Sequence, residues 1–241
     1  MSSDIKQLCK TLRLAYIAEA YESIPFESQE QYLTDLLKRE IQLREEAKCE
    51  RLIKKAQFLN KKTLEEYHWG EQIHFPPQID AKELCELHFI DNHENVILTG
   101  SPGTGKTHLA TGLGRRACQK GYEVRFYRVS ELVNTLEKMW REGKLTQFQN
   151  RFKKVDMIIL DEMGYIPFSK EGAELLFQLI SDWYEQKSLL ITSNLEFSQW
   201  NRIFLDARLT AALVDRVIHH AHILSFTGDS YRVTHALSRQ S

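Results

Sequence analysis

The chain has 241 residues, of which 42% are hydrophobic and 27% are charged, and its formal net charge is −1. This length suits one large domain with a smaller one attached, and the apolar content can fill a core. The net charge excludes nucleic-acid binding through overall charge, so any such binding depends on local basic patches. No apolar run approaches the roughly 20 residues that span a bilayer, and the start lacks a signal peptide, so we expect a cytoplasmic protein without membrane contact.

The first part of the chain is predicted to form a small all-helical domain over residues 1–68. It contains no glycine and one proline, and Leu33, Leu37 and Ile41 recur at helical spacing. We expect this domain to serve oligomerisation or to contact DNA or a partner. Its last helix is rich in cations, among them Lys38, Arg39, Arg51, Lys54 and Lys55. A solvated helix face and a surface that contacts nucleic-acid phosphates both agree with this charge pattern.

A change in composition marks the start of a second domain. Pro76 and Pro77 block helix continuation, so residues 69–80 are predicted to be a linker. Over residues 81–241, apolar runs typical of strands alternate with helical patterns; the runs are VILT, VRFYRV, VDMIIL, LLITS and HILSF. This alternation predicts an α/β domain with a parallel sheet that helices cover on both faces.

The stretch GSPGTGKT, residues 100–107, lies between a strand pattern and a helix pattern. Its glycines let backbone N–H groups and the helix N-terminus point at one anion, as in a phosphate loop. In such a loop Lys106 reaches the β- and γ-phosphates, and the hydroxyl of Thr107 ligates Mg²⁺. The residues predicted to bind ATP are Gly100, Ser101, Pro102, Gly103, Thr104, Gly105, Lys106, Thr107 and His108.

Two acidic residues end the run VDMIIL, at the edge of a parallel sheet where ligands bind. Asp161 is placed to hold Mg²⁺ through its water shell, and Glu162 to polarise the attacking water as a general base. An N-cap of the next helix is the alternative for this acidic pair. Asn194 follows the run LLITS in the same way, where its amide could orient the same water or be an ordinary loop residue.

A second basic region lies within residues 130–154. Lys138, Arg141 and Lys144 are close in sequence to Trp140. A surface that grips the DNA backbone and an amphipathic helix that covers the sheet both agree with this pattern.

Metal ligands other than those for Mg²⁺ are not expected. His219, His220 and His222 lack an i,i+4 pair and an accompanying carboxylate, so packing or solvent exposure is favoured over a metal site. The four cysteines show no CxxC spacing, which argues against a zinc site and against a disulfide framework.

A resemblance to a known family rests on five motifs: GSPGTGKTHLA, IILDEMGYIPFSKEGAELLFQLIS, LLITSNLEFSQW, LVDRVIHHA and GDSYR. They are similar to those of IstB-like proteins, the helper ATPases of bacterial insertion sequences, which are related to the helicase loader DnaC and the initiator DnaA. The resemblance covers essentially the whole chain. It implies an AAA+ P-loop NTPase fold with a parallel five-stranded sheet of order 5-1-4-3-2. It also implies a homo-oligomer with ATP at subunit interfaces, which assembles on duplex DNA and presents it to an IstA-like partner transposase.

The resemblance also implies roles for single residues. Asn194 is similar to the sensor-1 residue, and Arg232 to a sensor-2 arginine that acts within its own subunit. Arg216 resembles an arginine finger that reaches the γ-phosphate of a neighbouring subunit, although the residues alone favour an ion pair with Asp215. Arg208, eight residues earlier, could share or replace this role.

Three functions remain open at this point. The first is a transposition helper whose ATP-driven assembly on DNA is dismantled by hydrolysis, and the segments FSQW and HHA favour it. The second is a DnaC-like loader of a replicative helicase. The third is a nucleotide-gated DNA-binding scaffold in which turnover is incidental.

Overall fold

The computed structural model describes residues 2–228 and 230–231. The chain forms two compact units, one up to Leu52 and one from Ile53 onward. In the described part of the chain, no helix is both long and apolar enough to cross a membrane. Arg232 lies outside the described residues.

The described part of the first unit is helical. It consists of α1 (Ser2–Thr11), α2 (Ile17–Ala20) and most of α3 (Gln29–Ala56). The buried carboxylate of Glu40 on α3 accepts hydrogen bonds from the backbone N–H groups of Tyr16 and Ile17, at 2.9 and 2.8 Å. Arg44 pairs with the same carboxylate at 2.6 Å. A buried charge is stable only with such partners, so Glu40 fixes the start of α2 against α3.

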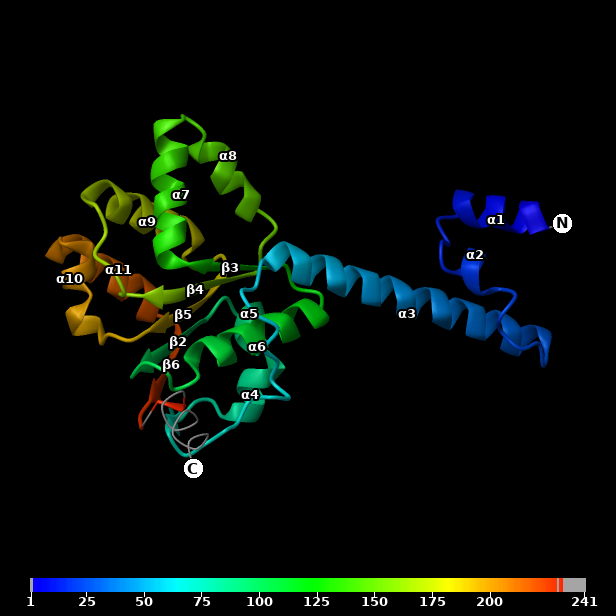
Figure 1. Ribbon diagram of the computed structural model, residues 1–241, viewed down its shortest axis with the longest axis horizontal. Helices are drawn as coiled ribbons and strands as arrows, with labels where there is room; N and C mark the ends of the chain where they lie inside the picture. Colours follow the sequence, from blue (N-terminus) through cyan, green and yellow to red (C-terminus); the bar gives the residue numbers. More distant parts are fainter. Residues whose placement is uncertain (1, 229, 232–241) are drawn as a thin grey trace, which may run out of the picture. The chain divides into compact units, whose positions relative to one another are not determined.

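The second unit alternates strands and helices (Figure 1). Its strands are β1 (Ile73–His74), β2 (Asn95–Gly100), β3 (Val124–Arg128), β4 (Met157–Met163), β5 (Ser188–Ser193) and β6 (Ala221–Phe226). Its α-helices are α4 (Ala81–Glu86), α5 (His88–Asp91), α6 (Lys106–Gln119), α7 (Val129–Arg141), α8 (Leu145–Gln149), α9 (Lys170–Trp183), α10 (Asn201–Phe204) and α11 (Ala207–Ile218). Short 3₁₀ turns are η1 (Asn150–Phe152) and η2 (Phe197–Gln199).

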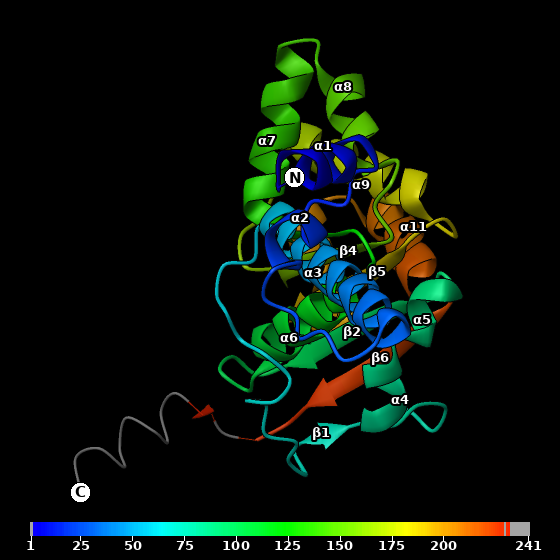
Figure 2. The same cartoon turned by 90° about the vertical axis from the view of Figure 1, so that its right-hand side faces the viewer.

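These strands form one sheet with the order β1-β6-β2-β5-β4-β3. The strands β2 to β6 are parallel, and numbered along the chain they lie in the order 5-1-4-3-2. The expectation of five strands missed β1, which adds an antiparallel edge with Ile73 opposite Phe226 (Figure 2). A strand of two residues is too short for a period-two pattern to reveal it.

The segment expected to be a linker, residues 69–80, belongs to the second unit and contributes β1. The residues just before it pack there as well. Leu64 is buried, and the ring of Phe58 meets Phe126 of β3 edge to face, with centroids 6.1 Å apart. The two units therefore divide at Leu52 and not near residue 69, because several apolar side chains after Leu52, such as Ala56 and Leu64, are buried within the second unit.

Helices cover both faces of the sheet, as the sequence pattern predicts (Figure 1). On one face α7, α9 and α11 bury Leu132, Leu176 and Leu213, and on the other α6 buries Leu109. Between these layers, residues 157–160 of β4 are fully buried, which explains their continuous apolar character. The parallel strands bring the polar residues at their ends to one carboxyl edge.

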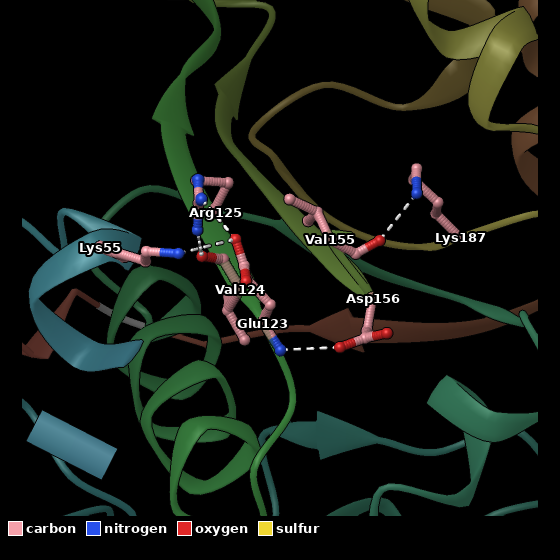
Figure 3. Close-up of polar contacts among 7 residues, drawn as sticks. All are labelled: Lys55, Glu123, Val124, Arg125, Val155, Asp156 and Lys187. Atoms are coloured by element: carbon pink, nitrogen blue, oxygen red, sulfur yellow. Dashed lines mark hydrogen bonds and ion pairs between the residues drawn. The ribbon is translucent and has the colours of Figure 1, made fainter. Parts of the chain in front are cut away.

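At the amino edge of the sheet, opposite the carboxyl edge, charged side chains form hydrogen bonds and ion pairs near the starts of β3 and β4 (Figure 3). Glu123 pairs with Arg125 at 2.6 Å and with Lys55 at 3.6 Å, and its N–H donates to Asp156 at 2.7 Å. Lys187 donates to the carbonyl oxygen just before Asp156 at 2.8 Å, and burial lowers the pKa of this lysine. The contacts anchor the beginnings of neighbouring strands.

Candidate nucleotide-binding site

The loop of residues 100–107 connects β2 to α6 at the carboxyl edge of the sheet. Gly100, Gly103 and Gly105 have φ angles of 134°, 81° and 95°, which glycine adopts without strain. Gly100 also lies close to β6, since a Cβ there would be 2.0 Å from the carbonyl oxygen of Phe226. Glycine is therefore required at this position both by conformation and by space.

Lys106 is the first residue of α6 and is only 6% exposed. Its Nζ donates hydrogen bonds to the carbonyl oxygens of Gly100 and Ser101, at 2.7 and 2.6 Å. The ammonium group thus lies against the loop, next to the N-terminus of α6. A buried cation beside a helix N-terminus creates a positive potential that suits a phosphate group.

A hydrogen-bond network joins this loop to the ends of β4 and β5. The Thr107 hydroxyl donates to Oδ1 of Asp161 at 2.9 Å, and the Thr192 hydroxyl donates to the same oxygen at 2.6 Å. Thr192 also accepts the backbone N–H of Glu162 at 3.0 Å. Asp161 is 1% exposed, so these donors stabilise a buried carboxylate. A hydroxyl and a carboxylate oxygen are hard ligands, so Thr107 and Asp161 could hold Mg²⁺.

Thr192 was not predicted from the sequence, which singled out Asn194 instead. The sequence does contain one sign of Thr192, because its hydroxyl interrupts the otherwise apolar run LLIT. The parallel pairing of β4 with β5 brings this position close to the acidic end of β4. The structure places Asn194 directly after β5, at the same edge of the sheet, with an exposed side chain.

A bulge in β4 separates Asp161 from Glu162. The pairing of β4 with β5 shifts between Leu160 and Met163, and Glu162 has a φ of 61°. A left-handed conformation in a non-glycine residue costs roughly 1 kcal/mol or more, and such strain is typical of functional sites. As a result, the Glu162 side chain is 44% exposed, and its carboxylate lies 3.7 Å from Nε of Arg128, the last residue of β3.

The side chain of His108 faces the segment before β1. Its Nε2 lies 2.9 Å from the carbonyl oxygen of Thr63, and its ring meets that of Tyr67 edge to face at 5.1 Å. Tyr67 in turn lies beside Gly105, and burial raises the pKa of its phenol. His108 therefore connects α6 to this segment, which gives it a supporting position behind the loop.

Comparison with known proteins assigns the chain to a family. The profile of the family "IstB-like ATP binding protein" matches residues 7–239. The chain belongs to this family. It is 36% identical to a protein of insertion sequence IS5376 from Geobacillus stearothermophilus, over 97% of this chain and 95% of that one. It is 35% identical to a protein of insertion sequence IS21 from Pseudomonas aeruginosa, over 95% of this chain and 89% of that one.

Solved structures show the fold of this IstB-like chain. AMPPCP-bound DnaA from Aquifex aeolicus matches with a TM-score of 0.58 and 23% identity, over 76% of this chain and 56% of that one. The DnaC helicase loader matches with a TM-score of 0.53 and 23% identity, over 69% of this chain and 97% of that one. The second unit thus has an α/β fold that resembles the AAA+ domains of DnaA and DnaC.

Arg216 of the IstB-like chain lies far from its own phosphate loop. It is in the last turn of α11, just before β6, whose first residue pairs with the first residue of β2, Asn95. Gly100, where the phosphate loop begins, lies at the other end of β2, about 16 Å from Asn95 along the strand. The Arg216 guanidinium stacks on the ring of Phe177 at 4.9 Å and donates to a backbone carbonyl of α11 at 2.9 Å. Arg208 lies at the start of α11, about 12 Å from Arg216 along the helix axis, and it is exposed.

The residues considered for DNA binding differ in their contacts. On α3, Lys38, Arg39, Arg51 and Lys54 are exposed, whereas Lys55 pairs with Glu123. On and after α7, Lys138 is exposed, Arg141 pairs with Glu137 at 3.2 Å, and Lys144 pairs with Glu142 at 2.8 Å. Trp140, between them, is 53% exposed.

The three histidines near the end of α11 do not form one group. His222 on β6 lies 3.1 Å from a carboxylate oxygen of Glu94. His219 and His220 lie instead beside Glu185, a carboxylate from the loop between α9 and β5. The expectation that no carboxylate accompanies these histidines was wrong, because folding supplies one from a position 34 residues before His219.

Proposed function

We propose that this IstB-like chain is an ATP-dependent DNA-binding ATPase that acts as a transposition helper. ATP binding drives its assembly into a homo-oligomer on duplex DNA, the assembly presents target DNA to a partner transposase, and hydrolysis dismantles it. The contact between Thr107 and Asp161 carries this proposal, because it joins a phosphate loop to an acidic strand end in one site. The names of the relatives, which refer to insertion sequences and ATP binding, support the role in transposition.

Each site residue has a distinct task in this mechanism. Lys106 neutralises the β- and γ-phosphates, and Thr107 and Asp161 would hold Mg²⁺, which supplies further neutralisation of phosphate charge when bound. Glu162 polarises the attacking water, for which its solvent-exposed carboxylate is suited. The amide of Asn194 orients the same water. Arg232, outside the described residues, is proposed to contact the nucleotide within its own subunit.

The position of Arg216 supports an active site shared between subunits. From the amino edge of the sheet, this guanidinium can neutralise a γ-phosphate only in another copy of the chain. Arginines supplied in this way accelerate hydrolysis about 1,000- to 100,000-fold in comparable enzymes, so an isolated subunit should be nearly inactive. Arg208 is the alternative donor.

The region around α7 and α8 is the proposed DNA contact. An exposed tryptophan, Trp140, lies in sequence between the cations Lys138 and Arg141, and this combination binds nucleic-acid backbones and stacks on bases. Arg141 and Lys144 would exchange their present carboxylate partners for phosphates. The exposed cations of α3 form a second candidate surface in the first unit.

The dependence of ATP turnover on protein concentration, with and without duplex DNA, tests this proposal. We expect the rate per subunit to rise steeply with concentration and to increase further with duplex DNA. A flat rate that ignores DNA would contradict both the shared site and the helper function.

A mixing experiment identifies the donor arginine. Arg216→Ala should bind ATP normally but lose hydrolysis, and adding Lys106→Ala subunits should restore part of the rate because they contribute an intact Arg216. If mixing restores nothing, but Arg208→Ala mixed with Lys106→Ala does recover turnover, Arg208 is the donor. Glu162→Gln addresses the scaffold alternative, since a scaffold would keep transposition in this variant.

Similarity to the DnaC helicase loader, which covers 97% of that structure, favours a helicase loader as the second candidate. Affinity capture with the tagged full-length chain distinguishes the two functions. Recovery of the replicative helicase without the transposase would favour the loader.

A further inference from the structure

Three potential metal ligands from two separate segments meet at the amino edge of the sheet. Glu185 follows α9, and His219 and His220 follow α11. The Glu185 Oε1 atom lies 3.9 Å from Nδ1 of His219 and 3.8 Å from Nε2 of His220. One ligand atom from each side chain lies within 4.8 Å of the others, and all three side chains are more than half exposed.

We propose that Glu185, His219 and His220 bind a divalent transition-metal ion of the Zn²⁺ type. Two imidazoles and one carboxylate are ligands that Zn²⁺ accepts, with water completing the coordination. Ligand atoms about 2.0 to 2.1 Å from a tetrahedral ion are about 3.4 Å apart. The two carboxylate–imidazole separations exceed this by about 0.5 Å, and the two imidazole nitrogens lie within 4.8 Å of each other, so rotations of the exposed side chains have to bring the three ligand atoms together.

The neighbouring hydroxyl of Tyr184 helps to orient this site. It lies 2.6 Å from Nδ1 of His219, the nitrogen that also faces Glu185. A bound ion takes the place of this hydrogen bond on Nδ1. This hydrogen bond orders the ring of His219 beforehand, and its loss on metal binding offsets part of the gain from the new metal–nitrogen bond.

A bound ion would join the end of α11 to the loop between α9 and β5. Arg216 lies three residues before His219 and stacks on Phe177 of α9, so the same two elements would be held together at two points. Metal binding should therefore raise the melting temperature of the second unit. This site is separate from the proposed ATPase function, because none of its three ligands has a role in nucleotide binding.

Titration of the full chain with Zn²⁺, in competition with a chromophoric chelator, tests the site. We expect one ion per chain with a dissociation constant in the micromolar range. Glu185→Gln and His220→Gln should each weaken binding at least about 10-fold, since each removes a ligand but is exposed enough to leave the fold intact. The matched control is His222→Gln, which changes a nearby histidine that pairs with Glu94 and should bind Zn²⁺ like the wild type.

Co²⁺ absorption provides a second readout, which reports the kind of ligands that the ion has. The wild type should show visible bands typical of nitrogen and oxygen ligands, and at a Co²⁺ concentration near the wild-type dissociation constant these bands should be much weaker in Glu185→Gln. Wild-type binding weaker than about 1 mM, an equal loss in His222→Gln, or thiolate charge-transfer bands from a cysteine site would each overturn the proposal. None of these measurements involves ATP turnover, so failure here leaves the proposed function unaffected.

Discussion

Thr192 offers a stringent test of how the acidic strand end is built. This side chain is 2% exposed, and its hydroxyl donates to Asp161 at 2.6 Å while accepting the N–H of Glu162 at 3.0 Å. The substitution Thr192→Val keeps the volume and the β-branched shape but removes both hydrogen bonds. Because Asp161 is buried, its carboxylate cannot replace the lost donor with water, and the partly buried N–H of Glu162 loses its acceptor.

The expected cost follows from the two bonds. A hydrogen bond to an ionised group contributes about 1.5 to 3 kcal/mol, and a neutral one about 1 kcal/mol. Thr192→Val should therefore lower the free energy of unfolding by about 2.5 to 4 kcal/mol. That is a large share of the roughly 5 to 15 kcal/mol that stabilises a typical domain.

Urea denaturation followed by tryptophan fluorescence measures this change in the correct unit, because Trp69, Trp140, Trp183 and Trp200 all lie in the second unit. Thr192→Ser is the matched control. It keeps the hydroxyl and loses one methyl group, which costs about 1 kcal/mol. The hydroxyl has no such role if the valine variant is as stable as the serine variant or more stable.

Three further predictions concern the loop, its strand and α11. Lys106→Ala should weaken ATP binding about 10- to 100-fold, since it removes a charged donor, and calorimetry measures the loss. Gly100→Ala should lower the free energy of unfolding by at least about 2 kcal/mol, because its Cβ would lie 2.0 Å from the carbonyl oxygen of Phe226; urea denaturation tests this. The carboxylate of Asp206 accepts hydrogen bonds from the backbone N–H groups of Leu209 and Arg208, and these bonds, above all the one from Leu209, lower its pKa. The ionised carboxylate therefore stabilises the fold above about pH 4, and this stabilisation is lost as the pH falls further. In Asp206→Asn the free energy of unfolding should therefore fall less steeply as the pH is lowered, which denaturation curves recorded between pH 2 and 6 would measure.

The parts of the site that lie within one short stretch could be predicted from the sequence. The loop at residues 100–107 has its own signature because the glycines, Lys106 and Thr107 act together through local backbone geometry. The alternation of apolar runs predicted the α/β class for the same reason, since each strand and helix carries its own period. Local patterns of this kind do not depend on which segments later become neighbours.

Contacts between distant segments account for what the sequence did not reveal. Thr192 is 31 residues from Asp161, and Glu185 is 34 residues from His219, so no spacing rule connects them. The division between the units was also placed too late in the chain. Proline was a visible marker near residue 76, whereas the packing of Phe58 on Phe126 of β3 depends on tertiary contacts.

The adjacent acids Asp161 and Glu162 show how one strand end can supply two different carboxylates. In a regular strand, successive side chains point to opposite faces of the sheet, and helices cover both faces here. The carboxylates of Asp161 and Glu162 would then both be buried, which is costly. The bulge after Leu160 avoids this, because the left-handed turn at Glu162 lets Asp161 stay buried among hydroxyl donors while Glu162 reaches solvent. A metal ligand needs the first environment and a group that polarises water needs the second. The strain at Glu162 therefore separates the two proposed roles, and the hydrogen bond from its N–H to Thr192 helps to hold that conformation.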